Sequence, residues 1–143
     1  MSLPTDLSNP NPAETAFSVV IPVYNRARLI ADCLCGFLAP EARGITVIVV
    51  DDGSQDGTQG VVAQIARQSR GATIRLVQQS HAGPATARNR GVAEAETDWI
   101  VFHDSDDLWL PWSIPTLKAA IAEPSARGAS VLFLAAERFR DPQ

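Results

Sequence analysis

The sequence has no stretch that could cross a membrane and no recognisable export signal. No apolar run approaches the roughly 18–20 residues that a transmembrane helix needs. Residues 1–11 are polar, contain two prolines, and have neither a basic start nor an apolar middle, which argues against a secretory signal. We therefore expect a cytoplasmic protein, with peripheral association to a membrane left open, and interpret residues 1–15 as a flexible leader.

Basic residues and cysteines are also scarce. The 12 Lys and Arg residues are outnumbered by 16 Asp and Glu residues, and the net charge is −4, so charge gives no reason to expect a nucleic-acid partner. Cys33 and Cys35 lie two positions apart in a predicted helix, where their side chains would point to different sides. They could neither pair nor share a metal ion, and we interpret them as small hydrophobic residues in a reducing compartment.

Two common ligand-binding loops are missing. No Gly-x-Gly-x-x-Gly sequence follows a strand, so the phosphate-binding turn of a dinucleotide-binding fold is absent and a nicotinamide cofactor is disfavoured. Asp52, Ser54, Asp56 and Gly57 resemble the start of a calcium-binding loop. Its twelfth position is Ala63, however, where that loop requires a bidentate glutamate, and this excludes the calcium site.

What the sequence does contain is a regular alternation of short apolar strands and amphipathic helices. We predict strands at 17–21, 45–50, 73–77, 98–103 and 130–134, and helices at 26–38, after Gly57, at 85–95 and at 114–122. This alternation predicts an α/β fold, a Rossmann-like and mostly parallel sheet flanked by helices, within one domain spanning residues 16–143. In such a sheet, ligands bind beyond the carboxyl ends of the strands.

The loop after the predicted strand 98–103 is the most acidic. Asp104, Asp106 and Asp107 directly follow an apolar run, so we expect their carboxylates to crowd together in one partly buried spot. Like charges this close repel one another unless a cation relieves them. The natural cation is Mn²⁺ or Mg²⁺, held by one or two carboxylates and by substrate phosphates. His103 should point to the opposite side of the strand from Asp104, and we do not expect it to be a ligand.

Residues in the first two loops suit nucleotide recognition, although each has a structural alternative. Tyr24 offers a ring on which a base could stack, and covering the sheet edge is an equally good explanation for it. Asp51 and Asp52 lie at the mouth of an apolar strand, where a carboxylate needs a donor or a cation. A base N–H or a ribose hydroxyl could supply that donor. Asp56 could instead cap the following helix.

The loop after the third strand opens a helix. Gly83 and Pro84 are typical of a helix start, which places Arg88 about one turn in, where its guanidinium can reach phosphate oxygens or a base edge. We interpret Arg90 as a solvated surface charge. His81 is interpreted as an ordinary polar loop residue.

Taken together, these four loops resemble one known family. The matching segments are Val20-Ile21-Pro22-Val23-Tyr24-Asn25, Val49-Val50-Asp51-Asp52-Gly53-Ser54, Gly83-x-x-x-Ala87-Arg88-Asn89-x-Gly91 and Trp99-Ile100-Val101-Phe102-x-Asp104-Ser105-Asp106-Asp107. In this order and spacing, the sequence resembles the inverting glycosyltransferases of family 2, which have the A-type glycosyltransferase fold. The resemblance covers about residues 17–134.

The resemblance implies a glycosyltransferase that binds a nucleoside-diphosphate sugar, often a UDP-sugar. The implied donor-binding residues are Pro22, Val23, Tyr24, Asp51, Arg88, Asp104 and Ser105. Tyr24 would stack on the base, Asp51 would accept from its ring N–H, and Pro22 and Val23 would line the pocket. Arg88 would contact the base or the diphosphate and Asp104 the ribose. Asp106 would bind the Mn²⁺ or Mg²⁺ ion that bridges the diphosphate.

A general base is not recognisable in the sequence. In the family it usually lies well beyond the metal motif, and no carboxylate after Asp106 stands in such a motif. We hypothesise a donor-binding half of an enzyme, truncated or taken from a longer chain, whose acceptor (saccharide, lipid or protein) is unknown. An apolar face exposed by the missing C-terminal half would favour self-association.

Two other function classes compete with this interpretation. A non-catalytic nucleotide-sugar-binding module would explain the missing base. A phospho-acceptor receiver domain fits less well, because the paired acids follow the second strand instead of the first and no lysine ends the fifth.

Overall fold

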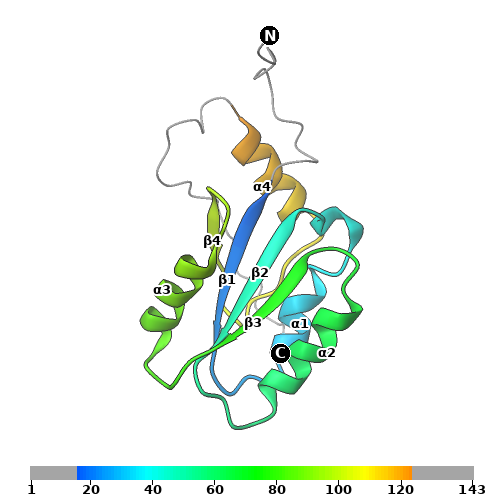
Figure 1. Cartoon of the computed structure of the whole chain (residues 1–143). Coiled ribbons are helices and arrows are strands. Elements are labelled where there is room, and N and C mark those ends of the chain that lie inside the picture. The colour runs from blue at the N-terminus through cyan, green and yellow to red at the C-terminus, as the bar shows by residue number, and fades with distance from the viewer. Residues whose placement is uncertain (1–15, 124–143) are drawn as a thin grey trace, which may run out of the picture.

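The computed structural model describes residues 16–123, which form a parallel sheet with helices on both faces (Figure 1). The elements are β1 (Phe17–Val23), α1 (Ile30–Cys35), the 3-10 turn η2 (Pro40–Ala42), β2 (Ile45–Asp51), α2 (Thr58–Gln68), β3 (Thr73–Gln78), α3 (Pro84–Glu94), β4 (Ile100–Phe102) and α4 (Ser113–Ala122). The predicted leader 1–15 and the predicted strand 130–134 lie outside the described residues.

The four described strands lie in the order β3-β2-β1-β4, and every neighbouring pair is parallel. β1 pairs with β2 along its whole length, from Phe17 opposite Ile45 to Val23 opposite Asp51. Every residue of β1 is buried, because helices cover both faces of the sheet, and this explains its almost continuously apolar sequence. The predicted α/β fold with a mostly parallel sheet is therefore confirmed.

The two faces of the sheet bury cores of different size. The larger core joins β1 and β2 to α1, α2 and α4 through Val19, Ile21, Val47, Val49, Ile30, Leu34, Val62, Ile114 and Leu117. The smaller one packs Ile48 and Val50 against Ala87 of α3, on the opposite face (Figure 1). Gly91 lets α3 approach β1 closely, because a Cβ at this position would overlap the side chain of Val20.

The helix predicted for residues 26–38 is shorter in the structure. Asn25 adopts a left-handed conformation (φ 51°). The next two backbone N–H groups donate to the side chains of Thr58, the first residue of α2, and Asp56 in the loop before it, instead of continuing a helix. At the other end, Ala39 precedes a proline and is extended, as such residues usually are. α1 is thus limited to residues 30–35. β4 is likewise shorter than predicted, with three residues paired to β1.

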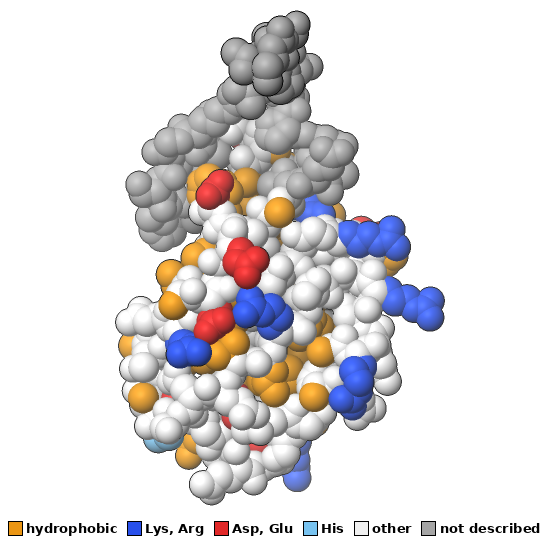
Figure 2. Space-filling model, in the orientation of Figure 1, with side chains coloured by type: hydrophobic (Ala, Val, Ile, Leu, Met, Phe, Trp, Pro, Cys, Tyr) orange, Lys and Arg blue, Asp and Glu red, His pale blue; other side chains and the backbone are white. Residues whose placement is uncertain are grey.

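The remaining expectations agree with the structure. α2, α3 and α4 lie where helices were predicted, and Pro84 occupies the first turn of α3. Cys33 is buried, Cys35 is exposed, and both thiols are free. Within residues 16–123, no helix has the length and apolar character to cross a membrane. The face in Figure 2 carries both basic and acidic side chains.

Candidate functional site

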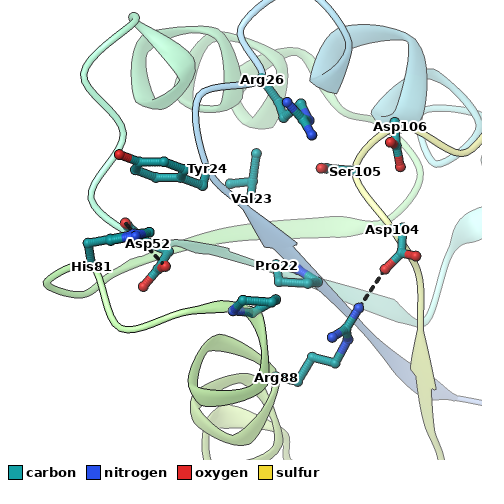
Figure 3. A pocket seen from close by; sticks show the side chains of 11 residues that line it. Pro22, Val23, Tyr24, Arg26, Asp52, His81, Arg88, Asp104, Ser105 and Asp106 are labelled. Atoms are coloured by element: carbon teal, nitrogen blue, oxygen red, sulfur yellow. Dashed lines mark hydrogen bonds and ion pairs between the residues drawn. The ribbon is translucent and has the colours of Figure 1, made fainter.

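The loops that follow the four strands enclose a pocket of about 380 Å³ at the carboxyl edge of the sheet (Figure 3). Its lining residues are Pro22, Val23, Tyr24, Arg26, Asp52, His81, Pro84, Arg88, Asp104, Ser105 and Asp106. Of the residues predicted from sequence, all but Asp51 line this pocket. Four further residues do so without having been predicted as site residues: Arg26, Asp52, His81 and Pro84.

The pocket has two chemically different ends. In Figure 3, Tyr24, Asp52 and His81 lie together at one end, and Asp104 and Asp106 lie at the other. The first end combines aromatic rings with a buried carboxylate, whereas the second presents exposed carboxylates. An elongated ligand with an aromatic part and an anionic part that carries a cation would therefore match the pocket.

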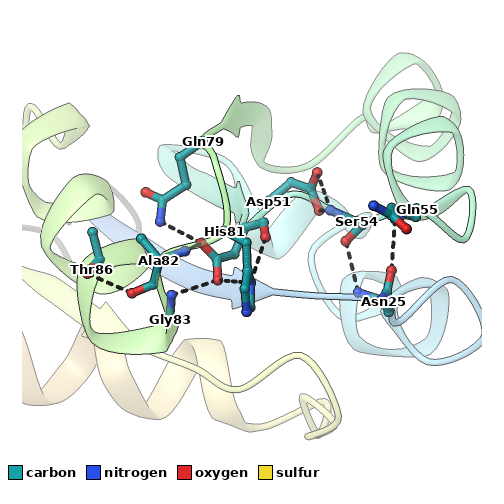
Figure 4. A network of polar contacts seen from close by, with 10 residues as sticks. Asn25, Asp51, Ser54, Gln55, Gln79, His81, Ala82, Gly83 and Thr86 are labelled. Carbon is teal, nitrogen blue, oxygen red and sulfur yellow. Dashed lines mark hydrogen bonds and ion pairs between the residues drawn. The ribbon is translucent and has the colours of Figure 1, made fainter.

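The β1 loop is held in place by the loop after β2. The Asn25 N–H donates to Ser54 Oγ at 2.8 Å, and Asn25 Oδ1 accepts from the Gln55 N–H at 2.8 Å (Figure 4). The N–H of Arg26 donates to Thr58 Oγ1 at 3.0 Å, and that of Ala27 to Asp56 Oδ2 at 3.0 Å. These four bonds fix the segment that carries Tyr24 and Arg26 to the pocket. Asp56, predicted as a helix cap, also accepts from the first N–H of α2 at 3.1 Å.

The two neighbouring acids after β2 face different sides of the sheet. Asp51 is fully buried, and its carboxylate accepts from Gln59 Nε2 of α2 at 2.6 Å and from the Ser54 N–H at 3.3 Å. Asp51 therefore supports the loop from beneath and is not among the pocket-lining residues; its predicted contact with a base N–H stays a prediction. Asp52, the next residue, turns to the α3 side and lines the pocket.

Asp52 is the most heavily hydrogen-bonded side chain of the site. It is 3% exposed and accepts from Gln79 Nε2 (2.7 Å), the Ala82 N–H (2.8 Å) and the Gly83 N–H (2.9 Å), three of the donors drawn in Figure 4. His81 Nδ1 lies 2.8 Å from its second oxygen. Burial alone would raise the pKa of Asp52, but these hydrogen bonds and the charge of His81 outweigh it and lower the pKa below its usual range.

His81 was not predicted to be functional, and the structure gives it a specific position. Its imidazole stacks on the Tyr24 ring, with centroids 4.2 Å apart and an angle of 28° between the planes. Gly53, at φ 82°, lies directly against the His81 backbone, so a larger residue there would crowd this loop. The sequence held no local signal for this position, because Tyr24, Asp52 and His81 come from three different loops.

Arg88 reaches the pocket from the second turn of α3, as predicted. Its guanidinium donates to Asp104 Oδ1 at 2.8 Å, and both side chains are partly exposed (Figure 3). The buried thiol of Cys33 lies 3.6 Å from the Asp104 carbonyl oxygen, to which it donates. Burial, together with the nearby carboxylates, raises the pKa of this thiol to about 12, so it is an inert packing group.

The expected crowding of three carboxylates in one partly buried spot is wrong. Asp104, Asp106 and Asp107 are all exposed, and the buried residue of the loop is Ser105. In the described part of the chain, no three metal-ligating side chains come together. The loop bends at this point, with the Asp107 N–H donating to the Asp104 carbonyl.

This arrangement still suits a metal ion that is shared with a ligand. Asp104 and Asp106 both line the pocket, and Mg²⁺ or Mn²⁺ commonly takes only one or two protein carboxylates and completes its coordination with phosphate oxygens and water. His103 was not expected to be a ligand, and it does not line the pocket. It packs against Phe37 and Trp109, and burial lowers its pKa.

Comparison with known proteins connects this site to one family. The profile of Glycosyl transferase family 2 matches residues 18–141. The glycosyltransferase GlyG of Streptococcus pneumoniae serotype 4 is 32% identical over 109 residues, which are 76% of this chain and 36% of GlyG.

Two solved structures have the same fold. The mannosyltransferase PcManGT of Pyrobaculum calidifontis, in complex with GDP-Man and Mn²⁺, superposes with a TM-score of 0.70 at 28% identity, covering 85% of this chain and 36% of PcManGT. TarS of S. aureus in complex with UDP-GlcNAc gives a TM-score of 0.66 at 27% identity, covering 75% of this chain and 31% of TarS. This chain thus spans about a third of the length of each of these three proteins, and it belongs to glycosyl transferase family 2.

Proposed function

We propose that the chain is the donor-binding part of a glycosyltransferase that uses a nucleoside-diphosphate sugar, with UDP-sugar as the first candidate. The observation that carries this proposal is the two-ended pocket, in which an aromatic and carboxylate end lies opposite two exposed carboxylates. The nucleotide sugars bound to PcManGT and TarS support it. The acceptor is not assigned.

The base would lie at the end formed by Tyr24 and Asp52. Tyr24 is 41% exposed and can offer a ring face for stacking. We assign the acceptor of the base N–H to Asp52 in place of Asp51, because only Asp52 lines the pocket. Pro22 and Val23 would line the floor between the base and the ribose.

The diphosphate would lie towards the other end. Arg88 and Arg26 both line the pocket and supply positive charge near it, while Asp104, with Ser105 beside it, would hold the ribose side. Asp106 would bind Mn²⁺ or Mg²⁺. The ion, when bound, offsets the charge that develops on the nucleoside-diphosphate leaving group. What the chain itself contributes is to bind and orient the donor.

The test is calorimetric titration of UDP and GDP, with Mn²⁺ and with EDTA, on the wild type and Asp106→Ala. We expect Mn²⁺ to strengthen wild-type binding and the substitution to reduce affinity in Mn²⁺ on the order of 10- to 100-fold, with little effect in EDTA. Asp107→Ala is the matched control, because it removes the same charge from an exposed neighbour that does not line the pocket. Binding that is independent of metal and unchanged by Asp106→Ala would remove Asp106 from the proposed site.

A second candidate is a non-catalytic nucleotide-sugar-binding module, because the pocket offers groups for nucleotide recognition while no general base has been assigned in the chain. Assays of donor hydrolysis and of transfer, run alongside binding, separate the two. Binding without either reaction would favour the module.

A further inference from the structure

His81 makes two contacts that are unusual for a loop histidine. Its ring is stacked on Tyr24 at 4.2 Å, and its Nδ1 lies 2.8 Å from Asp52 Oδ2 and 3.1 Å from the Asp52 carbonyl oxygen (Figure 3). The imidazole is thus a flat ring held by an aromatic face and by a nearly buried carboxylate. Both partners line the pocket.

These are the same two contacts that the proposed function assigns to a nucleobase. A base would stack on the ring of Tyr24 and donate a ring N–H to the carboxylate of Asp52. Each Asp52 oxygen already has two donors: Gln79 and the Ala82 N–H on Oδ1, and the Gly83 N–H and His81 on Oδ2. Since His81 lines the pocket and Gln79 does not, the bond from His81 is the one that a pocket ligand would replace.

His81 can leave this position without opening the core. Its side chain is 59% exposed, whereas that of Asp52 is 4% exposed. Two backbone N–H groups and Gln79 keep Asp52 in place when the imidazole turns away. Rotation about the His81 side-chain bonds would therefore vacate the Tyr24 face and one acceptor position, with the backbone of the loop unchanged.

We infer that the His81 imidazole occupies the nucleobase position of the free protein and that a nucleotide binds by displacing it. This inference rests on the proposed function and adds to it a residue that competes with the donor. The apparent affinity is then reduced by the fraction of molecules in which His81 fills the site.

The competition is for two partners, the Tyr24 ring face and the Asp52 carboxylate. The other charged or titratable groups that face this pocket are Tyr24 on the β1 loop, Arg26, Arg88 on α3, Asp104 and Asp106. They are unchanged in a His81 variant, so the difference between wild type and variant isolates His81.

The experiment is a calorimetric titration of UDP and GDP into the 143-residue chain at fixed Mg²⁺ and fixed pH. We expect His81→Ala to bind the better of the two nucleotides about 3- to 10-fold more tightly than the wild type. Gln79→Ala is the matched control. It removes another side-chain donor to Asp52 without touching Tyr24, and it should not bind nucleotide more tightly than the wild type.

A second measurement follows the ring itself. The chain has only two histidines, His81 and His103, and His103 packs against Phe37 and Trp109 outside the pocket lining. In side-chain nitrogen NMR spectra, nucleotide should shift the His81 signals towards those of a solvated imidazole and leave the His103 signals unchanged.

The outcomes separate the inference from the proposed function. Weaker binding by His81→Ala would mean that His81 contacts the ligand directly, and equal binding would mean that it does not compete. Either result overturns the inference and leaves the proposed function intact. Unmoved His81 signals on binding would also overturn it. If the wild type, His81→Ala and Gln79→Ala all fail to bind UDP and GDP, the proposed function fails, and the inference with it.

Discussion

At the scale of single residues, the site depends on which way adjacent side chains point. Asp51 and Asp52 are neighbours in the sequence, but one carboxylate bonds to Gln59 of α2 and the other to backbone N–H groups at the start of α3. Successive side chains at a strand end alternate between the faces of the sheet. That alternation was available in the sequence, and it could have separated a supporting aspartate from one that lines the pocket.

Asp52 should contribute to stability as well as to binding. The pKa of its carboxylate is lowered in the folded protein, so its contribution is complete above the unfolded-state pKa of about 3.9 and is lost as the pH falls through the folded value. We expect Asp52→Asn to lower the free energy of unfolding by about 2–3 kcal/mol at pH 7, since the amide cannot satisfy every donor around it. Urea denaturation at pH 7 and at decreasing pH measures this.

Measuring the effect of Asp52→Asn at several pH values tests whether the ionised carboxylate is what stabilises the fold. Below about pH 4 the difference between the wild type and Asp52→Asn should shrink, because the wild-type carboxylate becomes protonated. Asp106→Asn, an exposed site, should change stability by less than about 0.5 kcal/mol throughout. A constant difference between Asp52→Asn and the wild type across the series would contradict a role for the ionised carboxylate.

At the scale of elements, the approach of α3 to the sheet positions part of the pocket lining. α3 carries Pro84 and Arg88 to the pocket, and its position over β1 depends on the absence of a side chain at Gly91. Val20, the residue it meets, is fully buried. One glycine in a helix thereby helps to position Arg88, which lies less than one turn away.

Gly91→Ala should therefore be destabilising although alanine is the better helix former. A Cβ would overlap the Val20 side chain, and overpacking of this kind costs about 1–3 kcal/mol. Gly60→Ala in α2 is the control, because a Cβ there meets no atom within 4 Å; we expect it to be neutral or stabilising by up to about 1 kcal/mol.

Thermal or urea unfolding of the two glycine variants gives the comparison directly. The double variant Gly91→Ala/Val20→Ala should recover part of what Gly91→Ala loses, because it removes the overlapping methyl groups. If Gly91→Ala were as stable as Gly60→Ala, α3 could move away from Val20 without loss of free energy of unfolding.

At the scale of the whole molecule, all four loops of the sheet edge are linked to one another. Asn25 joins the β1 loop to the β2 loop, Asp52 joins the β2 loop to the β3 loop, and Arg88 joins α3 to Asp104. The pocket is consequently organised within residues 16–123. Because the chain spans about a third of PcManGT and of TarS, groups that act on an acceptor are not assigned to it.

We predict that the 143-residue chain binds a nucleoside diphosphate but transfers sugar slowly. Turnover should lie below about 1 s⁻¹, the lower end of the usual range for enzymes, because no residue has been assigned as the general base that takes the acceptor proton. The measurement is release of UDP or GDP from UDP-GlcNAc and GDP-Man, with and without simple sugar acceptors. Turnover within the usual range would contradict the donor-half hypothesis and favour a complete enzyme.

The sequence by itself determined the alternation of strands and helices, the parallel sheet and the four loops that build the pocket. These features depend on local patterns, namely apolar runs, helical spacing and a Gly-Pro helix start, each read within a dozen residues. The helix predicted for residues 26–38 began too early because the N–H groups of Arg26 and Ala27 donate to side chains about 30 positions further on.

Only the tertiary structure decided the partners of the polar groups. Asp52 finds its partners 27 to 31 residues away in the chain, and the three acids after β4 are exposed instead of partly buried. His81 is positioned by a ring on one loop and a carboxylate on another. Strand alternation predicts which face of the sheet a side chain takes. The hydrogen-bond partners of that side chain come from distant loops, and no local pattern encodes them.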